Sequence, residues 1–115
     1  MRNTPEIREA LLLVIATADR LHTGYQITVR VCGGDNDISL NIRQPRDTDE
    51  AVYPEIYFSD DWYGEDAVSF EISTTGYSDH SLKQAHRVIA GLCAATKLVE
   101  NLYTAFEVAG FNTRR

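Results

Sequence analysis

The most regular pattern in the chain is a series of apolar residues at steps of three and four near the C-terminus. This spacing matches the 3.6-residue period of an amphipathic α-helix. It predicts a helix over residues 82–109, begun by a capping box at Ser81 and Gln84 and stopped by Gly110. One side of this helix is expected to be buried along its whole length: Leu82, Ala85, Ile89, Leu92, Thr96, Val99, Tyr103 and Phe106.

A second helical pattern occupies the N-terminal region. Thr4 is suited to cap a helix and Pro5 to its first turn, so a helix is predicted over residues 5–22, ending before Gly24. Its core-facing residues are Ile7, Ala10, Leu11, Val14, Ala18 and Leu21. However, Leu12, Leu13 and Ile15 also make the other sides of the helix apolar. Two interpretations remain open: the helix is wedged between the sheet and the last helix, or it contacts another copy of the chain.

Four segments between the two helices alternate between apolar and polar residues, as half-buried β-strands do. They cover residues 25–32, 38–43, 52–58 and 67–74. The turn at 33–37 joins the first two as a hairpin, and Pro54 marks an edge position or a bulge in the third. On the outward face we expect Thr28, Arg30, Ser39, Asn41, Arg43, Tyr53, Tyr57, Ser69 and Glu71.

The order of elements, α-β-β-β-β-α, predicts the fold class. Short connections between consecutive strands favour an antiparallel arrangement, and strands with one apolar face need helices on that face only. We therefore predict an α+β fold in which a four-stranded antiparallel meander carries the N- and C-terminal helices on one face. A length of 115 residues fits a single domain over residues 1–115.

Charge is unevenly distributed along the chain. The net charge is −6, but residues 35–79 contain twelve acidic and two basic residues, a net of −10. The rest of the chain contains nine basic and five acidic residues, a net of +4. An acidic balance disfavours direct binding to nucleic acid or to an anionic membrane, and it permits binding to a basic protein.

Further features indicate a cytoplasmic protein. The longest apolar run is too short to span a bilayer, and the N-terminus lacks the pattern of a signal peptide. Cys32 and Cys93 form no CxxC pair, so reduced thiols are the expectation.

Three features contain residue types found in reactive or metal-binding sites. Asp79-His80-Ser81 contains the residue types of a hydrolase triad, but neighbours in sequence do not point at one another, so helix capping is the favoured interpretation. His86 and Cys93 are two helical turns apart, which favours a partly buried structural histidine and thiol over a nucleophilic pair. The acidic loop at 60–66 lacks the alternating spacing of a calcium loop. We expect no catalytic residues, no metal and no cofactor.

The sequence therefore predicts a non-enzymatic module that binds protein. The hypothesis is an inhibitor, of the kind that a phage or mobile element encodes, docking on a basic nucleic-acid-binding protein through acidic loops. Exposed aromatic residues often anchor interfaces, so an acidic loop containing Trp and Tyr is a candidate contact. The predicted contact residues are Asp47, Asp49, Glu50, Asp60, Asp61, Trp62, Tyr63, Glu65 and Asp66.

The alternative hypothesis is self-assembly. In that case the chain is a structural or accessory subunit, forming for example a homodimer through the apolar flanks of its helices. The contact residues would be Leu12, Leu13 and Ile15 on the first helix and Leu98 and Leu102 on the last.

Overall fold

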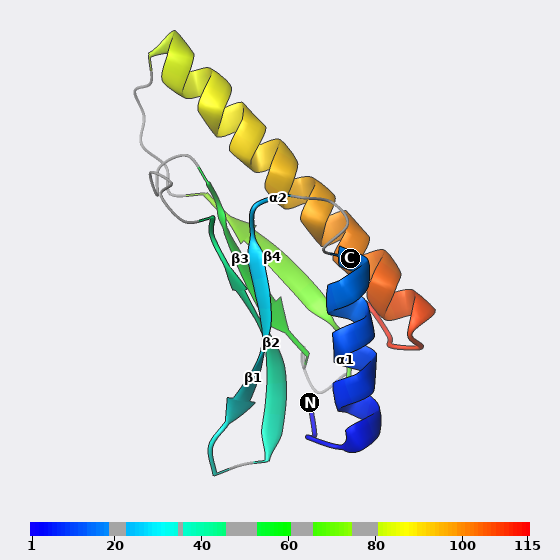
Figure 1. Cartoon of the computed structure of the whole chain (residues 1–115). Helices are drawn as coiled ribbons and strands as arrows, with labels where there is room; N and C mark the ends of the chain where they lie inside the picture. The colour runs from blue at the N-terminus through cyan, green and yellow to red at the C-terminus, as the bar shows by residue number, and fades with distance from the viewer. Residues whose placement is uncertain (19–22, 35, 46–52, 61–65, 75–80) are drawn as a thin grey trace.

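A computed structural model describes residues 1–18, 23–34, 36–45, 53–60, 66–74 and 81–115. Along the chain, one helix precedes the four strands and one follows them, as the sequence predicts. The fold is of mixed α and β type (Figure 1). The elements are α1 (Pro5–Ala18), β1 (Gln26–Cys32), β2 (Asp37–Arg43), β3 (Glu55–Ser59), β4 (Ser69–Ser73) and α2 (Leu82–Val108).

Helix α1 begins as predicted. The backbone N–H of Ile7 donates to the Thr4 hydroxyl at 3.2 Å, so Thr4 satisfies one of the unpaired amides of the first turn. Leu11, Val14 and Ala18 are buried against the rest of the molecule. The predicted end of this helix, residues 19–22, lies outside the described residues, and so does the core residue Leu21.

The predicted four-stranded meander is not confirmed. β1 and β2 form an antiparallel hairpin with Val29 opposite Leu40, and β3 and β4 form a second one with Phe58 opposite Phe70. Among the described residues the two hairpins are separate two-stranded sheets, although β2 and β3 are neighbours. A two-stranded ribbon twists more strongly than a wide sheet, which favours divergence of the facing edges.

The third and fourth strands are shorter than predicted. β3 begins only after Pro54, because proline has no N–H to donate to a ladder. β4 begins at Ser69, and Val68 before it instead makes a parallel bridge to Thr113 of the C-terminal tail. The tail thereby adds backbone pairing that the strand pattern did not indicate.

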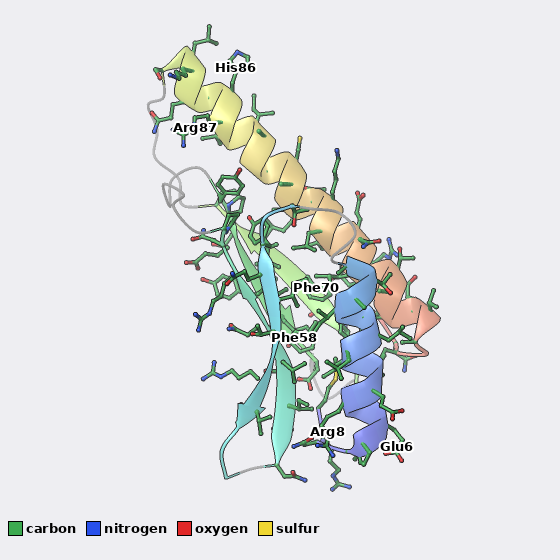
Figure 2. All side chains as sticks on the ribbon, viewed as in Figure 1. Glu6, Arg8, Phe58, Phe70, His86 and Arg87 are labelled. Atoms are coloured by element: carbon green, nitrogen blue, oxygen red, sulfur yellow. The ribbon has the colours of Figure 1, made fainter. Side chains whose placement is uncertain are left out.

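The core lies where the C-terminal half of α2 faces the strands. Phe106 is fully buried. The centroid of its ring lies 5.9 Å from the ring centroid of Phe58 and 6.0 Å from that of Phe70. Figure 2 shows Phe58 and Phe70 directed from the β3–β4 hairpin toward the helices. Helix α1 packs mainly on α2, and the Asn101 side-chain amide donates to the Thr17 carbonyl at 3.2 Å.

Tyr103 connects three parts of the core. Its hydroxyl accepts from the backbone N–H of Phe70 in β4 at 2.8 Å. It donates to the backbone carbonyl of Arg114 in the tail at 2.9 Å. One side chain of α2 therefore binds both β4 and the C-terminal segment.

Candidate functional site

Most of the residues predicted to contact a partner lie outside the described residues. These are Asp47, Asp49, Glu50, Asp61, Trp62, Tyr63 and Glu65, and their arrangement stays a prediction. Asp66 is described and exposed. The Asp60 carboxylate accepts a hydrogen bond from the N-terminal amine of Met1 and is therefore already paired within the chain. Asp37 Oδ1 lies 3.5 Å from the same nitrogen. Asp60 and Asp66 border one hollow of about 430 Å³, beside Phe111.

A second hollow, of about 460 Å³, lies where the two hairpins separate. Its polar lining comes mainly from β2, β3 and their ends: Arg30, Ser39, Asn41, Gln44, Glu55 and Tyr57. Most of these residues belong to the predicted outward face. Ser69 was also expected there, but it is buried, because the C-terminal tail pairs beside the start of β4.

The polar groups of this second hollow are partly engaged with one another. The Tyr57 hydroxyl donates to Glu55 Oε2, and this hydrogen bond raises the pKa of Tyr57. Gln44 Nε2 donates to the backbone carbonyl of Tyr53. The described lining therefore offers hydrogen-bonding groups to a ligand, and two of them, Tyr57 and Glu55, are already paired with each other.

The most distinctive surface is the N-terminal half of α2, residues 82–93, which extends beyond the ends of the strands (Figure 1). We call this segment the projecting half of α2. Leu82, Ile89 and Leu92 in it are 76%, 59% and 40% exposed. The molecule is accordingly elongated, 48 Å in its longest dimension against 27 and 25 Å in the others.

This exposure corrects the predicted burial of α2. The expected buried stripe is continuous in sequence, but only its C-terminal part, from Val99 through Tyr103 to Phe106, is buried. The physical reason is length: a 27-residue helix extends about 40 Å at 1.5 Å per residue, whereas a five-residue strand such as β4 extends about 17 Å. The first turns of α2 therefore have no strand beneath them. The orientation of the helix contributes as well, because Gly91, Ala95 and Leu98 face the core where Leu92 and Thr96 are exposed.

The projecting half of α2 is basic. From residue 82 to residue 99 the helix contains Lys83, Arg87 and Lys97 and no acidic residue. Figure 2 shows His86 and Arg87 on the part of α2 that lies beyond the strands. Helical spacing places Lys83 and Arg87 on the side away from Ile89, and Lys97 beyond the projecting half lies beside the stripe, so the stripe itself contains no charged residue. An exposed, uncharged apolar stripe on an ordered helix is typical of a contact surface.

Helix α1 also has an apolar outer face. Leu12 and Leu13 are each 60% exposed, which contradicts the first of the two open interpretations, that α1 is wedged between the sheet and the last helix. Ile15 is half-buried and packs on the core. Leu98 and Leu102 are only 1% and 0% exposed, so these two predicted oligomer contacts belong to the core of the chain itself.

One histidine and two cysteines lie within the described residues: His86, Cys32 and Cys93. His86 and Cys93 are both exposed on the projecting half of α2, which contradicts the expectation of partial burial. Cys32 is half-buried at the end of β1. Within the described part of the chain, no three His, Cys, Asp or Glu side chains lie together as ligands for a metal ion. Ser81 is the N-cap of α2, as predicted, and Asp79 and His80 lie outside the described residues.

Comparisons with protein-family models, curated proteins and solved structures find no match. Among the described residues, no helix combines the length and apolar character needed to cross a membrane. The projecting half of α2 is the surface that sequence reasoning missed, and the signal was the mismatch in length between the last helix and the short strands.

Proposed function

We propose that this chain acts by binding protein, with the projecting half of α2 as its docking element. The observation that carries the proposal is the exposure of Leu82, Ile89 and Leu92 along one side of an ordered helix. An amphipathic helix that lays its apolar side against another protein is a common mode of recognition. Exposed apolar side chains gathered on one element favour this interpretation over ordinary scattered surface residues.

Cys93 supplies a direct test, because it is exposed and lies next to Leu92. A photo-crosslinker is attached to Cys93 in a chain whose Cys32 is replaced by alanine. The labelled chain is then mixed with a lysate of its host and illuminated. Discrete adducts are expected, to a second copy or to a foreign protein. These adducts should disappear in an Ile89→Asp variant, because a carboxylate in the stripe must lose its water on contact.

The matched control is Ala90→Asp, which adds the same charge on the same helical turn. Ala90 is exposed and helical spacing places it away from the stripe, so this variant should keep the adducts. If Ile89→Asp and Ala90→Asp give the same adducts as the unmodified stripe, the proposal fails. Circular dichroism of each variant verifies that the helix content is unchanged.

The acidic surface remains a second proposal, with the function of an inhibitor that docks on a basic nucleic-acid-binding protein. It is favoured by the exposure of Glu55, Asp66 and Glu71 on or beside the strands, away from the basic half of α2. We propose that reversing charge at Asp61, Glu65 and Asp66 abolishes retention of a basic partner at low salt. Exposed charge contacts are screened by salt, so high salt should have the same effect. Unchanged retention in the reversed variant contradicts this second proposal.

A further inference from the structure

We propose that the hollow between β2 and β3 is a docking slot for an extended segment of another protein, which enters as an additional strand between the two hairpins. The slot is the second hollow described above, of about 460 Å³. Addition of a strand to an unpaired sheet edge is a common mode of peptide recognition. The inference is independent of the proposed docking role of α2, because no residue of α2 lines this hollow.

The first wall of the slot is the edge of β2 that faces away from β1. The backbone N–H of Ile38 donates to the Met1 carbonyl at 2.7 Å, and Met1 lies beyond the edge that is not paired with β1. Successive residues of a strand direct their backbone groups to opposite edges, so Leu40 and Ile42 share the direction of Ile38. Both residues line the hollow. β2 therefore directs two N–H and two C=O groups into the slot.

The second wall is the edge of β3 that faces away from β4. The backbone N–H of Phe70 in β4 donates to the Tyr103 hydroxyl, so Phe70 directs its backbone groups away from β3. Its partner across the ladder is Phe58, which then directs its own backbone groups away from β4, as does Ile56 two residues before it. Phe58 and Ile56 also line the hollow. β3 therefore adds two N–H and two C=O groups to the slot.

These two facing edges determine the kind of occupant. Within the described part of the chain, β2 and β3 belong to separate sheets and form no ladder with each other. An extended peptide directs successive N–H and C=O groups to opposite sides, so its main chain can pair with both edges at once. A helix cannot do so, because its backbone groups are already bonded within the helix.

The chain itself places main chain in this gap. At one end of the gap the Met1 carbonyl accepts from Ile38 of β2, and the Met1 amine binds the Asp60 carboxylate directly after β3. Residues 1–3 thereby pair antiparallel with residues 36–38. The N-terminal segment thus bonds to both sides of the gap, and a docked segment would continue its line along the open part of β2.

The side chains around the slot define the composition of the docked segment. Alternate residues of a strand point to opposite faces, so one set would lie over the core and the other on the outward face. On the outward face, Arg30 lines the slot and forms no ion pair with a described residue. Glu55 is already bonded to the Tyr57 hydroxyl. We therefore expect alternating apolar and polar residues, with an acidic residue near Arg30.

A phage-displayed library of linear peptides of about ten residues, the upper end of usual strand lengths, is the probe. Peptides are selected on the full chain, and their Kd is measured by titration calorimetry. The expected peptides alternate apolar and polar residues and include an acidic one. Arg30→Glu should raise their Kd at least about tenfold, whereas Arg8→Glu on α1 (Figure 2) should leave it within about twofold. Failure to select any such peptide would overturn the inference.

Backbone methylation of the selected peptide distinguishes insertion from addition to a single edge. In an inserted strand every central N–H bonds to one wall or the other, so N-methylation at each central position should raise Kd at least about tenfold. A peptide added only to an open edge, such as that of β1, bonds through alternate residues. Sensitivity at alternate positions only would therefore contradict the slot.

A disulfide across the slot tests its position. Asn41→Cys and Tyr57→Cys are introduced on the outward face of β2 and β3, in a chain with Cys32→Ala and Cys93→Ala. A disulfide holds the two Cα atoms within about 7 Å, whereas an inserted strand sets the walls about 9.6 Å apart, twice the strand spacing. The oxidised chain should lose the peptide, and the same chain after reduction should bind it. Equal binding in both states would overturn the inference.

Hydrogen exchange of the free chain provides the competing outcome, in which β2 and β3 pair directly. The Ile42 and Phe58 amides face the slot and should exchange faster than the Asn41 and Tyr57 amides, which face the ladders, and they should slow when the peptide binds. Equal protection of all four amides in the free chain would mean that no slot exists. Ile89→Asp should leave the peptide Kd within about twofold, so the slot and the docking role of α2 fail separately.

Discussion

Removing the Tyr103 hydroxyl is the sharpest test of how the core is held together. Tyr103 is 6% exposed, and its hydroxyl is the acceptor for the Phe70 amide at 2.8 Å and a donor to the Arg114 carbonyl at 2.9 Å. In Tyr103→Phe the ring stays, with its edge-to-face contact to Phe70 at 5.1 Å between centroids. The substitution therefore isolates two hydrogen bonds from the packing of the ring.

The expected loss of stability in Tyr103→Phe follows from the burial of the groups that the hydroxyl pairs. A buried donor left without an acceptor costs about 1–3 kcal/mol. A hollow of about 290 Å³ borders Phe70, Tyr103 and Arg114, so water can reach the position that the hydroxyl leaves. Water that pairs the freed groups reduces the loss of stability toward the lower end of this range. We expect Tyr103→Phe to lower the free energy of unfolding by about 1–2 kcal/mol, which corresponds to a Tm decrease of roughly 4–8 °C.

The assay is urea unfolding followed by circular dichroism, together with hydrogen exchange of the Phe70 amide. The matched control is Tyr57→Phe, because the Tyr57 hydroxyl bonds only to Glu55 among the described residues and the side chain is exposed. That variant should stay within about 0.5 kcal/mol of the original chain. Equal stability of the two variants, with an unchanged exchange rate at Phe70, would refute the role assigned to the Tyr103 hydroxyl.

Three further predictions concern other parts of the chain. Phe106→Ala should destabilise by about 3–5 kcal/mol in urea unfolding, because it opens a cavity among buried rings, whereas Val108→Ala, at an exposed position, should change little. Burial raises the pKa of Tyr25 to about 12, with the negative charge of neighbouring Tyr53 contributing. An unfolded tyrosine titrates near 10, so this stabilisation is complete below about pH 10 and is lost as pH rises toward 12. An absorbance titration should show a tyrosinate component near pH 12 that Tyr25→Phe removes, and a midpoint near 10 for that component would contradict the shift. Ser81→Ala removes the hydroxyl that accepts from the Gln84 amide at 3.2 Å, and the loss of this helix cap costs about 1 kcal/mol. We expect faster hydrogen exchange in the projecting half of α2 and a nearly unchanged Tm. A cooperative loss of stability would mean instead that this segment unfolds with the core.

Local signals in the sequence predicted the individual elements well. Thr4 and Ser81 are caps because a short side-chain oxygen can accept from the amides of the first turn, and both do so here. Gly110 has φ +93°, a conformation open to glycine, and α2 ends just before it. The alternation of apolar and polar residues predicted the positions of all four strands. The third strand begins only after Pro54, because proline has no N–H to donate to a ladder. These features depend on neighbouring residues only, so the sequence by itself determined them.

Tertiary structure decided which apolar faces are covered. The same heptad stripe is exposed at Ile89 and buried at Phe106, and nothing in its periodicity distinguishes the two. Leu13 and Leu102 have the same side chain on amphipathic helices, yet one is exposed and the other lies in the core. The separation of the β1–β2 and β3–β4 hairpins likewise depends on twist and packing across the molecule. Periodicity fixes which side chains share a face, whereas burial depends on the length and position of whatever lies opposite, and that is a property of the assembled chain.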